Sequence, residues 1–551
     1  MKKFYTTFLI ITYLTGISAY SQYLVSHQLL ASYTQQEAYD YLVSQGLPAA
    51  LIPITNGLKS YKIVYNTVGW DSSATIASGV VFVPQGLTCK SPIMVYNHGT
   101  MLKRSQAPSN MGGEYLIGVA TSADGMVVAM PDYLGLGESP GIHPYHHAHS
   151  EATCVIDMIR ATRELSVVLD YGLNDQVFLT GYSQGGHVTM ATHKLIESSF
   201  SSEFKIAASA PLSGAYQLSG VQAEVITRDS SYGAPGYLPF IINTFNTVYN
   251  LYPSYSDIYK SPYDVLIPPF FDGNYSIGQL ENVIPDTPKA ILLPSVLSDF
   301  ENNPNNPFRL TLEENNLYNW SPIAPMRMYY CEADELVTYL NALEAKNTMH
   351  INGAVHVESV SANPAAGHQD CALYALLQTK FYFELYRNDR YTVQVQTYAA
   401  SGAGIDDGMA TAIPLGGYEP YTYNWSNGMQ GETVNGLGSG QYSVIVTDAN
   451  GCETTAYAGI GTIGLPTYTE SMSWTAYPNP ANEHLNLKFE HQIEKGMYVL
   501  TSMQGDVVHM QALTSISGEV RISVEGLSDG VYLLSVYADG KHGNLRIVVQ
   551  H

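Results

Sequence analysis

One short stretch of the 551-residue sequence carries the clearest sign of nucleophilic chemistry. The segment GYSQGGHV, residues 181–188, follows the apolar run VFLT and precedes the amphipathic stretch TMATHKLIESSF. A strand that ends in a glycine, turns sharply at a serine and continues as a helix exposes the serine hydroxyl at the carboxyl edge of a sheet. Glycines on both sides relieve crowding at such a turn. This context predicts Ser183 as a nucleophile, and a glycine-rich structural turn is the alternative.

A serine nucleophile needs a histidine base, and the histidine needs a carboxylate that orients its ring. At a turn of this type the acid and then the histidine follow the serine along the chain. Asp334 in MYYCEADELV is the preferred acid because it comes directly after a predicted strand. Glu332 and Glu335 are the alternatives.

Three histidines follow this acid before the C-terminal region, at positions 350, 356 and 368. The first two fall in strand-like sequence. His368, in NPAAGHQDCALYALLQ, lies between the last predicted strand and a helix, where a base can reach the sheet edge. We therefore predict His368 as the base, with His356 as the fallback.

The oxyanion of an acyl intermediate needs two fixed N–H donors, one after the nucleophile and one from the loop after an early strand. The first donor is predicted at Gln184. The second is predicted at Thr100 in VYNHGTMLKRS, where His98 and Gly99 shape the turn.

The segment GIHPYHHAHSEA holds four histidines, at positions 143, 146, 147 and 149. No paired cysteine or well-spaced carboxylate accompanies them, and their spacing fits no zinc motif. We therefore predict no metal site and interpret the segment as a loop that enters a helix. No organic cofactor is expected for the chemistry at Ser183.

Charge and cysteine content narrow the function further. Lys and Arg number 25 against 48 Asp and Glu, and the net charge of -23 repels nucleic acid and anionic membrane surfaces. The five cysteines, at 89, 154, 331, 371 and 452, form no C-x-x-C pair, which argues against zinc or dithiol redox sites. Cys331 precedes Asp334 by three residues and Cys371 follows His368 by three, so a disulfide between them can form if the triad is correct.

The N-terminus MKKFYTTFLIITYLTGISAYSQ is typical of a secretory signal peptide over residues 1–22, with two lysines, a short apolar run and small residues. A membrane anchor is the weaker alternative because threonines and tyrosines interrupt the run, which is shorter than the roughly 20 residues of a span. The low charge and many tyrosines also indicate an extracellular protein. No transmembrane span is expected in the mature chain.

Between about residues 60 and 390, short apolar runs alternate with amphipathic stretches, which predicts an α/β domain with a mostly parallel sheet. The first two strands are joined by the hairpin signal GWDSS, so the sheet begins antiparallel. Helices are predicted over about 148–169, 185–199 and 369–387. An insertion at 215–320, rich in Tyr, Pro and Asn, is expected to pack as a helical lid-like excursion.

Beyond residue 390 the pattern changes to short alternating strands separated by Gly, Asn and Asp. It predicts two small all-β sandwich modules, over 391–457 and 474–551, joined by a linker at 458–473.

Several motifs together resemble the secretory lipase and esterase branch of the α/β-hydrolase superfamily. These are NHGT, MPDYLGLGES, HPY before CVIDMIRATREL, and GYSQGG. The resemblance implies an α/β-hydrolase domain over residues 23–390. The site residues that it implies, together with those predicted above, are Ser183, Asp334 and His368 for catalysis, Thr100 and Gln184 for the oxyanion, and His98, Gly99, Asp132, Tyr133 and Tyr182 for substrate binding.

The two β modules resemble other families. The segment PYTYNWSNGMQGETVNGLGSGQYSVIVTDANGC is similar to the SprB repeats of bacterial gliding adhesins. The segment from YPNPANEHLNLKF to the C-terminus looks like the C-terminal sorting domain of type IX secretion cargo. This resemblance implies passage across the outer membrane, removal of the tail, and either release or attachment at the cell surface.

The sequence as a whole predicts a secreted serine hydrolase that cleaves carboxylic esters, with a lipid ester or an acylated small molecule as substrate. One alternative is a serine peptidase of the prolyl oligopeptidase type, although the chain lacks the β repeats of an N-terminal propeller. The other is a surface adhesin in which the hydrolase fold only binds.

Overall fold

The computed structural model of the chain describes residues 23–47, 53–401, 404–461, 468–469, 474–490, 492–502, 507–538 and 541–551. The predicted signal peptide, residues 1–22, lies outside them. Across these described ranges, no helix has both the length and the apolar character that a bilayer crossing requires.

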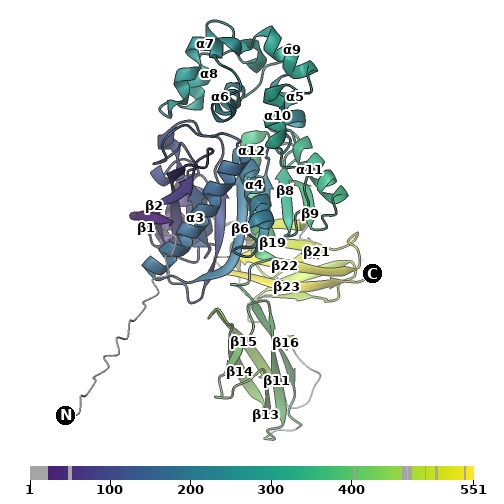
Figure 1. The fold of residues 1–551 in the computed structure, drawn as a ribbon. Helices are drawn as coiled ribbons and strands as arrows, with labels where there is room; N and C mark the ends of the chain where they lie inside the picture. The colour runs from purple at the N-terminus through teal and green to yellow at the C-terminus, as the bar shows by residue number, and fades with distance from the viewer. Residues whose placement is uncertain are drawn as a thin grey trace, which may run out of the picture.

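A nine-stranded sheet in the order β1-β2-β3-β5-β4-β6-β7-β8-β9 forms the first domain (Figure 1). The pairs β1/β2, β2/β3 and β3/β5 are antiparallel, and all later pairs are parallel. The predicted sheet with its antiparallel start is therefore confirmed. The strands are β1 Leu24–Tyr33, β2 Leu58–Val68, β3 Ala74–Pro84, β4 Ser91–Asn97, β5 Val127–Pro131, β6 Leu173–Tyr182, β7 Lys205–Leu212, β8 Met326–Tyr330 and β9 Val357–Ser361.

Helices cover both faces of this sheet and bury it between two hydrophobic cores. Because both faces are covered, the central strand β4 has no exposed position and its sequence is apolar almost throughout. The helices are α3 Ala148–Leu169, α4 Gln184–Ser199 and α11 Leu340–Ile351 on one side, and α1 Gln35–Ser44, α2 Tyr115–Ala123 and α12 His368–Glu384 on the other. The three predicted helices correspond to α3, α4 and α12.

The insertion at 215–320, here called the cap, is a group of short helices at the top of Figure 1. It has its own apolar core, to which Leu102, Tyr145 and Val337 of the sheet domain also belong. Prolines at the first turns of α9 and α10 suit helix starts, because their fixed φ matches the helix and their missing N–H would have no partner there. The α-helices are α5 Ala223–Ile226, α6 Tyr237–Tyr249, α7 Tyr263–Leu266, α8 Ile277–Glu281, α9 Pro294–Asn302 and α10 Pro307–Glu314, with further helical turns of other types at η4 Leu218–Gln222, η5 Tyr255–Asp257, η6 Pro268–Asp272 and η7 Pro288–Ile291.

The first β module packs two antiparallel sheets, β13-β11-β10-β16 and β12-β14-β15, around Trp425. Its strands extend into the segment predicted as a linker, because β15 continues to Ile460 and β16 pairs with β10. The predicted linker over 458–473 is therefore too long. The strands are β10 Thr392–Tyr398, β11 Gly408–Leu415, β12 Thr422–Trp425, β13 Thr433–Leu437, β14 Gly440–Thr447, β15 Glu453–Ile460 and β16 Tyr468–Thr469.

The C-terminal module also consists of two antiparallel sheets, β17-β18-β21 and β20-β19-β22-β23, drawn in yellow in Figure 1. It contacts the sheet domain at α12, where Phe381 packs against Met497 and Val499. Its strands are β17 Trp474–Tyr477, β18 His484–Phe489, β19 Ile493–Ser502, β20 Val507–Ile516, β21 Glu519–Ser523, β22 Gly530–Ala538 and β23 Lys541–Val549.

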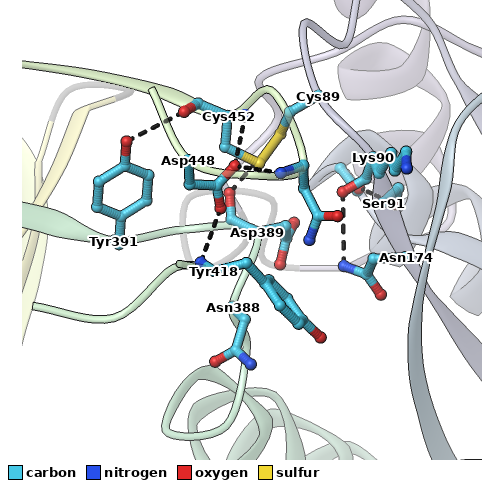
Figure 2. Close-up of a disulfide and its surroundings, with 12 residues drawn as sticks. Cys89, Lys90, Ser91, Asn174, Asn388, Asp389, Tyr391, Tyr418, Asp448 and Cys452 are labelled. Carbon is cyan, nitrogen blue, oxygen red and sulfur yellow. Dashed lines mark hydrogen bonds between the residues drawn. A yellow bond between two sulfur atoms is a disulfide. The ribbon is translucent and has the colours of Figure 1, made fainter. Parts of the chain in front are cut away.

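A disulfide joins the sheet domain to the first β module. Cys89, in the loop after β3, is bonded to Cys452, which is 363 positions away and lies between β14 and β15 (Figure 2). The Cys452 carbonyl accepts a hydrogen bond from the Tyr391 hydroxyl at 3.0 Å, and its N–H donates to Asp448 Oδ1 at 2.9 Å. The bond ties the module covalently to the sheet domain, and the sequence did not predict it.

Candidate active site

The GYSQG segment forms a sharp turn between β6 and α4, with Ser183 at its tip. The serine has φ 60° and ψ -117°, a conformation that L-residues rarely adopt and that persists only where the surroundings enforce it. A Cβ atom at Gly181 would lie 2.4 Å from the Asn97 carbonyl oxygen, and one at Gly185 only 1.9 Å from it. Backbone proximity therefore requires both glycines, as the motif predicts.

The three side chains predicted for nucleophile, base and acid form one hydrogen-bonded chain. His368 Nε2 lies 2.9 Å from Ser183 Oγ, and His368 Nδ1 lies 2.8 Å from Asp334 Oδ2. They come from the turn after β6, the turn after β8 and the first residue of α12. All three are buried, so little water competes for these contacts.

Backbone groups fix the orientation of the acid. Asp334 Oδ1 accepts hydrogen bonds from the N–H groups of Leu336 at 3.0 Å and Val337 at 2.8 Å, which leaves Oδ2 for the imidazole. The alternative acid Glu335 accepts from the His368 N–H at 3.0 Å, so it holds the backbone of the histidine rather than its ring. Glu332 and the fallback His356 are exposed and stand apart from this chain.

A disulfide connects the loops of the acid and the base. Cys331 and Cys371 are bonded, with 5.9 Å between their Cα atoms, which confirms the pairing anticipated from their spacing around Asp334 and His368. The bond links the turn after β8 to the first turn of α12, and the Tyr182 hydroxyl donates to the His368 carbonyl at 2.6 Å on the other side. The position of the imidazole is thus set from two directions.

The backbone N–H groups of Gln184 and Thr100, the predicted oxyanion donors, have no hydrogen-bond acceptor within the part of the chain that the structure describes. The neighbouring Gly99 N–H is occupied, because it donates to Glu114 Oε1 at 3.1 Å. His98 supports the same loop, with Nε2 3.1 Å from the Asp132 carbonyl oxygen.

Asp132 and Tyr133, predicted to contact substrate, are both fully buried. The Asp132 carboxyl accepts from Ser78 Oγ at 2.5 Å and from the Ser109 N–H at 2.9 Å, and burial raises the pKa of this carboxyl. The Tyr133 hydroxyl donates to the His98 carbonyl at 3.1 Å. These contacts place the two residues beneath the Thr100 loop, as its support.

A second buried network meets Gln184 through its side chain. Gln184 Nε2 lies 2.7 Å from Glu151 Oε1 and also 2.7 Å from His143 Nε2, and Glu151 Oε2 lies 3.2 Å from His187 Nδ1. Burial opposes ionisation of the Glu151 carboxyl, but the neighbouring imidazoles, His187 foremost, outweigh it and hold the pKa of Glu151 at about 2. Sequence analysis missed Glu151 and His187 because they belong to different helices.

Two cavities lead from Ser183 into the cap. The first has a volume of about 30 Å³ and is lined by Ser183, Gln184, His146 and side chains of the cap. The second has a volume of about 50 Å³ and lies inside the cap, where its lining is almost entirely apolar. The residues that line both are Leu218, Gln222, Ile226 and Ile241.

Family comparisons divide the chain in the same way as the fold. Residues 475–550 match the secretion system C-terminal sorting domain, and residues 107–373 match the secretory lipase family. The sorting domain marks the protein as one exported through the type IX secretion system. No curated protein matches the chain.

Among solved structures, a protein from Legionella pneumophila described as a hydrolase is 26% identical, with a TM-score of 0.63 over 66% of this chain and 98% of that one. The rice cell wall degrading esterase LipA from Xanthomonas oryzae is 31% identical, with a TM-score of 0.58 over 65% of this chain and 95% of LipA. Candida antarctica lipase A in its closed state, at 15% identity and a TM-score of 0.50 over 66% of this chain and 81% of that one, shares the fold. The chain belongs to the secretory lipase family and is a carboxylic ester hydrolase of the α/β-hydrolase fold.

Proposed function

We propose that the protein cleaves carboxylic esters through a covalent acyl-enzyme, with Ser183 as nucleophile, His368 as general base and acid, and Asp334 as the group that orients the imidazole. The observation that carries this proposal is the unbroken chain of contacts from Asp334 Oδ2 through the His368 ring to Ser183 Oγ. With Asp334 accepting from Nδ1, the lone pair of Nε2 faces the serine hydroxyl.

The reaction follows from these positions. Ser183 Oγ attacks the ester carbonyl carbon as its proton passes to His368 Nε2, and the carbonyl oxygen takes up negative charge between the N–H groups of Gln184 and Thr100. Collapse of this intermediate breaks the bond to the alcohol oxygen, which takes the proton from Nε2. Water then adds to the acyl-enzyme by the same route, and the carboxylic acid leaves with Ser183 restored. These residues suffice without a metal or organic cofactor in any step.

The cavities support an ester with an apolar acyl chain. The cap cavity is lined mostly by aliphatic and aromatic side chains, and it shares four lining residues with the cavity beside the serine. An alkyl chain gains free energy from leaving water in such surroundings, whereas a peptide would bury unpaired amide groups there. Both cavities are narrow, so we further propose that the cap moves as a lid when substrate enters.

The test is turnover of short and long p-nitrophenyl acyl esters beside a prolyl arylamide. Wild type is expected to hydrolyse the esters, and Ser183→Ala is expected to lose this activity. Ser122→Ala is the control and should keep the activity, because Ser122 is a buried serine of α2 outside the Asp334–His368–Ser183 contacts. Turnover of the amide alone would favour a peptidase. A folded wild-type protein inactive on every substrate would contradict the proposal and favour a binding role.

We also propose how the chain is processed. Residues 1–22 would be removed on export, and the sorting domain from about residue 474 would be removed after passage across the outer membrane. The first β module, similar to SprB repeats, would remain with the hydrolase domain because it precedes the cleaved segment, and the Cys89–Cys452 bond would hold it there by a second covalent link. Mass measurement of the protein recovered from outside the cell tests this, and an intact C-terminus would contradict it.

A further inference from the structure

A second group of buried, potentially metal-binding side chains lies beside Gln184. His146 comes from the histidine-rich loop, Glu151 from the first turn of α3 and His187 from the first turn of α4. Each offers one ligand atom, and these atoms all lie within 4.8 Å of one another. All three residues are buried, with His187 and Glu151 essentially inaccessible to solvent.

Both ring nitrogens of His187 face oxygen atoms that accept hydrogen bonds. Nε2 is 3.2 Å from the carbonyl oxygen of Asn315, which can only accept a hydrogen bond. Glu151 Oε2, at 3.2 Å from Nδ1, also only accepts, so a neutral ring with its single proton leaves one ring nitrogen facing an acceptor with no proton between them. Two acceptors at that distance repel each other unless a cation or a second proton lies between them.

His146 adds an independent sign of an unfilled bonding position. Its Nδ1 atom is buried and has no hydrogen-bond partner in the described residues, which costs free energy in a protein interior. Its backbone has φ 60°, an uncommon value for a residue with a side chain, and its N–H donates to Glu151 Oε1 at 3.0 Å. The loop is thus held in a strained form that keeps the His146 ring against the carboxylate and the second imidazole.

We propose that His146, Glu151 and His187 bind one divalent transition-metal ion of the zinc class. Two imidazoles and one carboxylate are ligands that Zn²⁺ favours, at about 2.0–2.2 Å from the ion, and the 3.2 Å between Glu151 and His187 suits two such ligands. A single ion accounts for two observations: the close approach of Glu151 Oε2 to His187 Nδ1, and the lack of a hydrogen-bond partner at His146 Nδ1.

The next layer of contacts fits the same assignment. Ligating histidines usually donate their other N–H to a carbonyl or carboxylate, as His187 does to Asn315, and ligating carboxylates usually accept a further hydrogen bond, as Glu151 does from Gln184. The cavity of about 30 Å³ that His146 lines has room for about one water as a fourth ligand. The ion would fasten the loop, α3 and α4 together beneath the Ser183 turn, and no step of ester cleavage passes through it.

The test is the metal content of the full chain, purified without a metal-affinity tag and dialysed against Zn²⁺ and then buffer. Elemental analysis is expected to find one Zn²⁺ per chain. A chelator should remove the ion and lower the midpoint of thermal unfolding by several degrees, and Zn²⁺ should restore it. Replacement by Co²⁺ should give the visible absorption of a tetrahedral site, a readout that needs no variant.

Two variants localise the ion. His146→Ala is expected to lose the bound metal, whereas His149→Ala, which alters an exposed histidine in the first turn of α3, should retain it. Folded wild type that holds no metal after this treatment, with an unfolding midpoint insensitive to chelator, would overturn the proposal and assign a second proton to His187. The outcome is independent of whether Ser183 is the nucleophile, because it is read from metal content and stability.

Discussion

The protein contains two buried histidine–carboxylate pairs next to the Ser183 turn, and they differ in the partner of the ring nitrogen that faces away from the carboxylate. In the pair Asp334–His368, Nε2 faces the Ser183 hydroxyl at 2.9 Å. In the pair Glu151–His187, Nε2 faces the Asn315 carbonyl at 3.2 Å. A hydroxyl can give up a proton to the ring and a carbonyl cannot, so only the first pair can carry protons to and from a substrate.

The comparison teaches that the chemistry of a histidine–carboxylate pair depends on its third partner. Both pairs are held by backbone groups and both are shielded from water. Burial and a nearby carboxylate therefore do not by themselves identify a catalytic histidine. The contacts of Glu151 and His187 suit a structural role, whether a metal ion or a proton lies between the two side chains.

The largest effect is expected from breaking the first pair's contact with Ser183. Ser183→Ala and His368→Ala should each lower kcat for a p-nitrophenyl ester by about 10⁶-fold, because the groups act as one unit. The double variant should be no worse than either single variant. Losses that multiply in the double variant would contradict a shared role.

The next largest effect is expected from Asp334→Asn, which should lower kcat by about 10⁴-fold. The amide can donate to His368 Nδ1, which favours the tautomer with the proton on Nε2, and that nitrogen then cannot accept the Ser183 proton. The thermal unfolding of this variant should stay close to that of wild type because the amide oxygen can still accept from Leu336 and Val337. Activity near the wild-type level would mean that the ring is held mainly by Tyr182 and the disulfide.

Breaking the second pair should affect stability more than turnover. Glu151→Gln is expected to lower the free energy of unfolding by about 3–5 kcal/mol, because it leaves a buried cation without its carboxylate. The decrease in kcat should be far smaller than for Asp334→Asn. Denaturant unfolding and ester kinetics on the same preparation check this, and a large loss of kcat at unchanged stability would remove the distinction between the pairs.

The next effect, on stability, is expected from removal of the Cys331–Cys371 disulfide beside Asp334 and His368. Replacing Cys331 and Cys371 together by serine should lower the free energy of unfolding by about 2–4 kcal/mol, because the bond closes a loop of 40 positions. Chemical denaturation of the variant and of wild type, both without reductant, measures this. An unchanged stability would show that packing alone holds the two loops.

The smallest effect on activity is expected from a substitution in the cap, where the cavities next to Ser183 lie. Ile241 lines both cavities, so Ile241→Trp should fill the passage between them. The ratio of kcat/KM for long over short acyl esters should fall by about tenfold, a typical value for a change in an apolar pocket. An unchanged ratio would place the acyl chain elsewhere.

The sequence predicted the parts of this molecule that depend on local pattern. Continuous apolar strands such as β4 arise because both faces of the sheet are covered, and the two glycines beside Ser183 are imposed by the Asn97 carbonyl. The sequence could anticipate that Asp334 and His368 lie beside Ser183, because an acid and a base are expected after sheet strands in a set order. The spacing of Cys331 and Cys371 around these two residues indicated that a disulfide could form, and the structure contains it.

What the sequence did not predict depends on contacts between distant segments. Glu151 and His187 sit in the first turns of two different helices and meet only when α3 packs against α4. The histidine-rich loop was set aside as a metal site because its carboxylate and third ligand lie outside any recognised spacing. The bond between Cys89 and Cys452 spans 363 positions, so no local signal marks it.

That bond also sets an order for maturation outside the reducing cytoplasm. Cys154 is the next thiol after Cys89 along the chain, and in the native protein it is the free cysteine, buried in the core beside Tyr65. If disulfides formed before the domain folded, Cys89 could pair with Cys154, because Cys154 leaves the cytoplasm before Cys452 during export. A domain that folds first buries Cys154 and leaves Cys89 to pair with Cys452, the last cysteine of the chain.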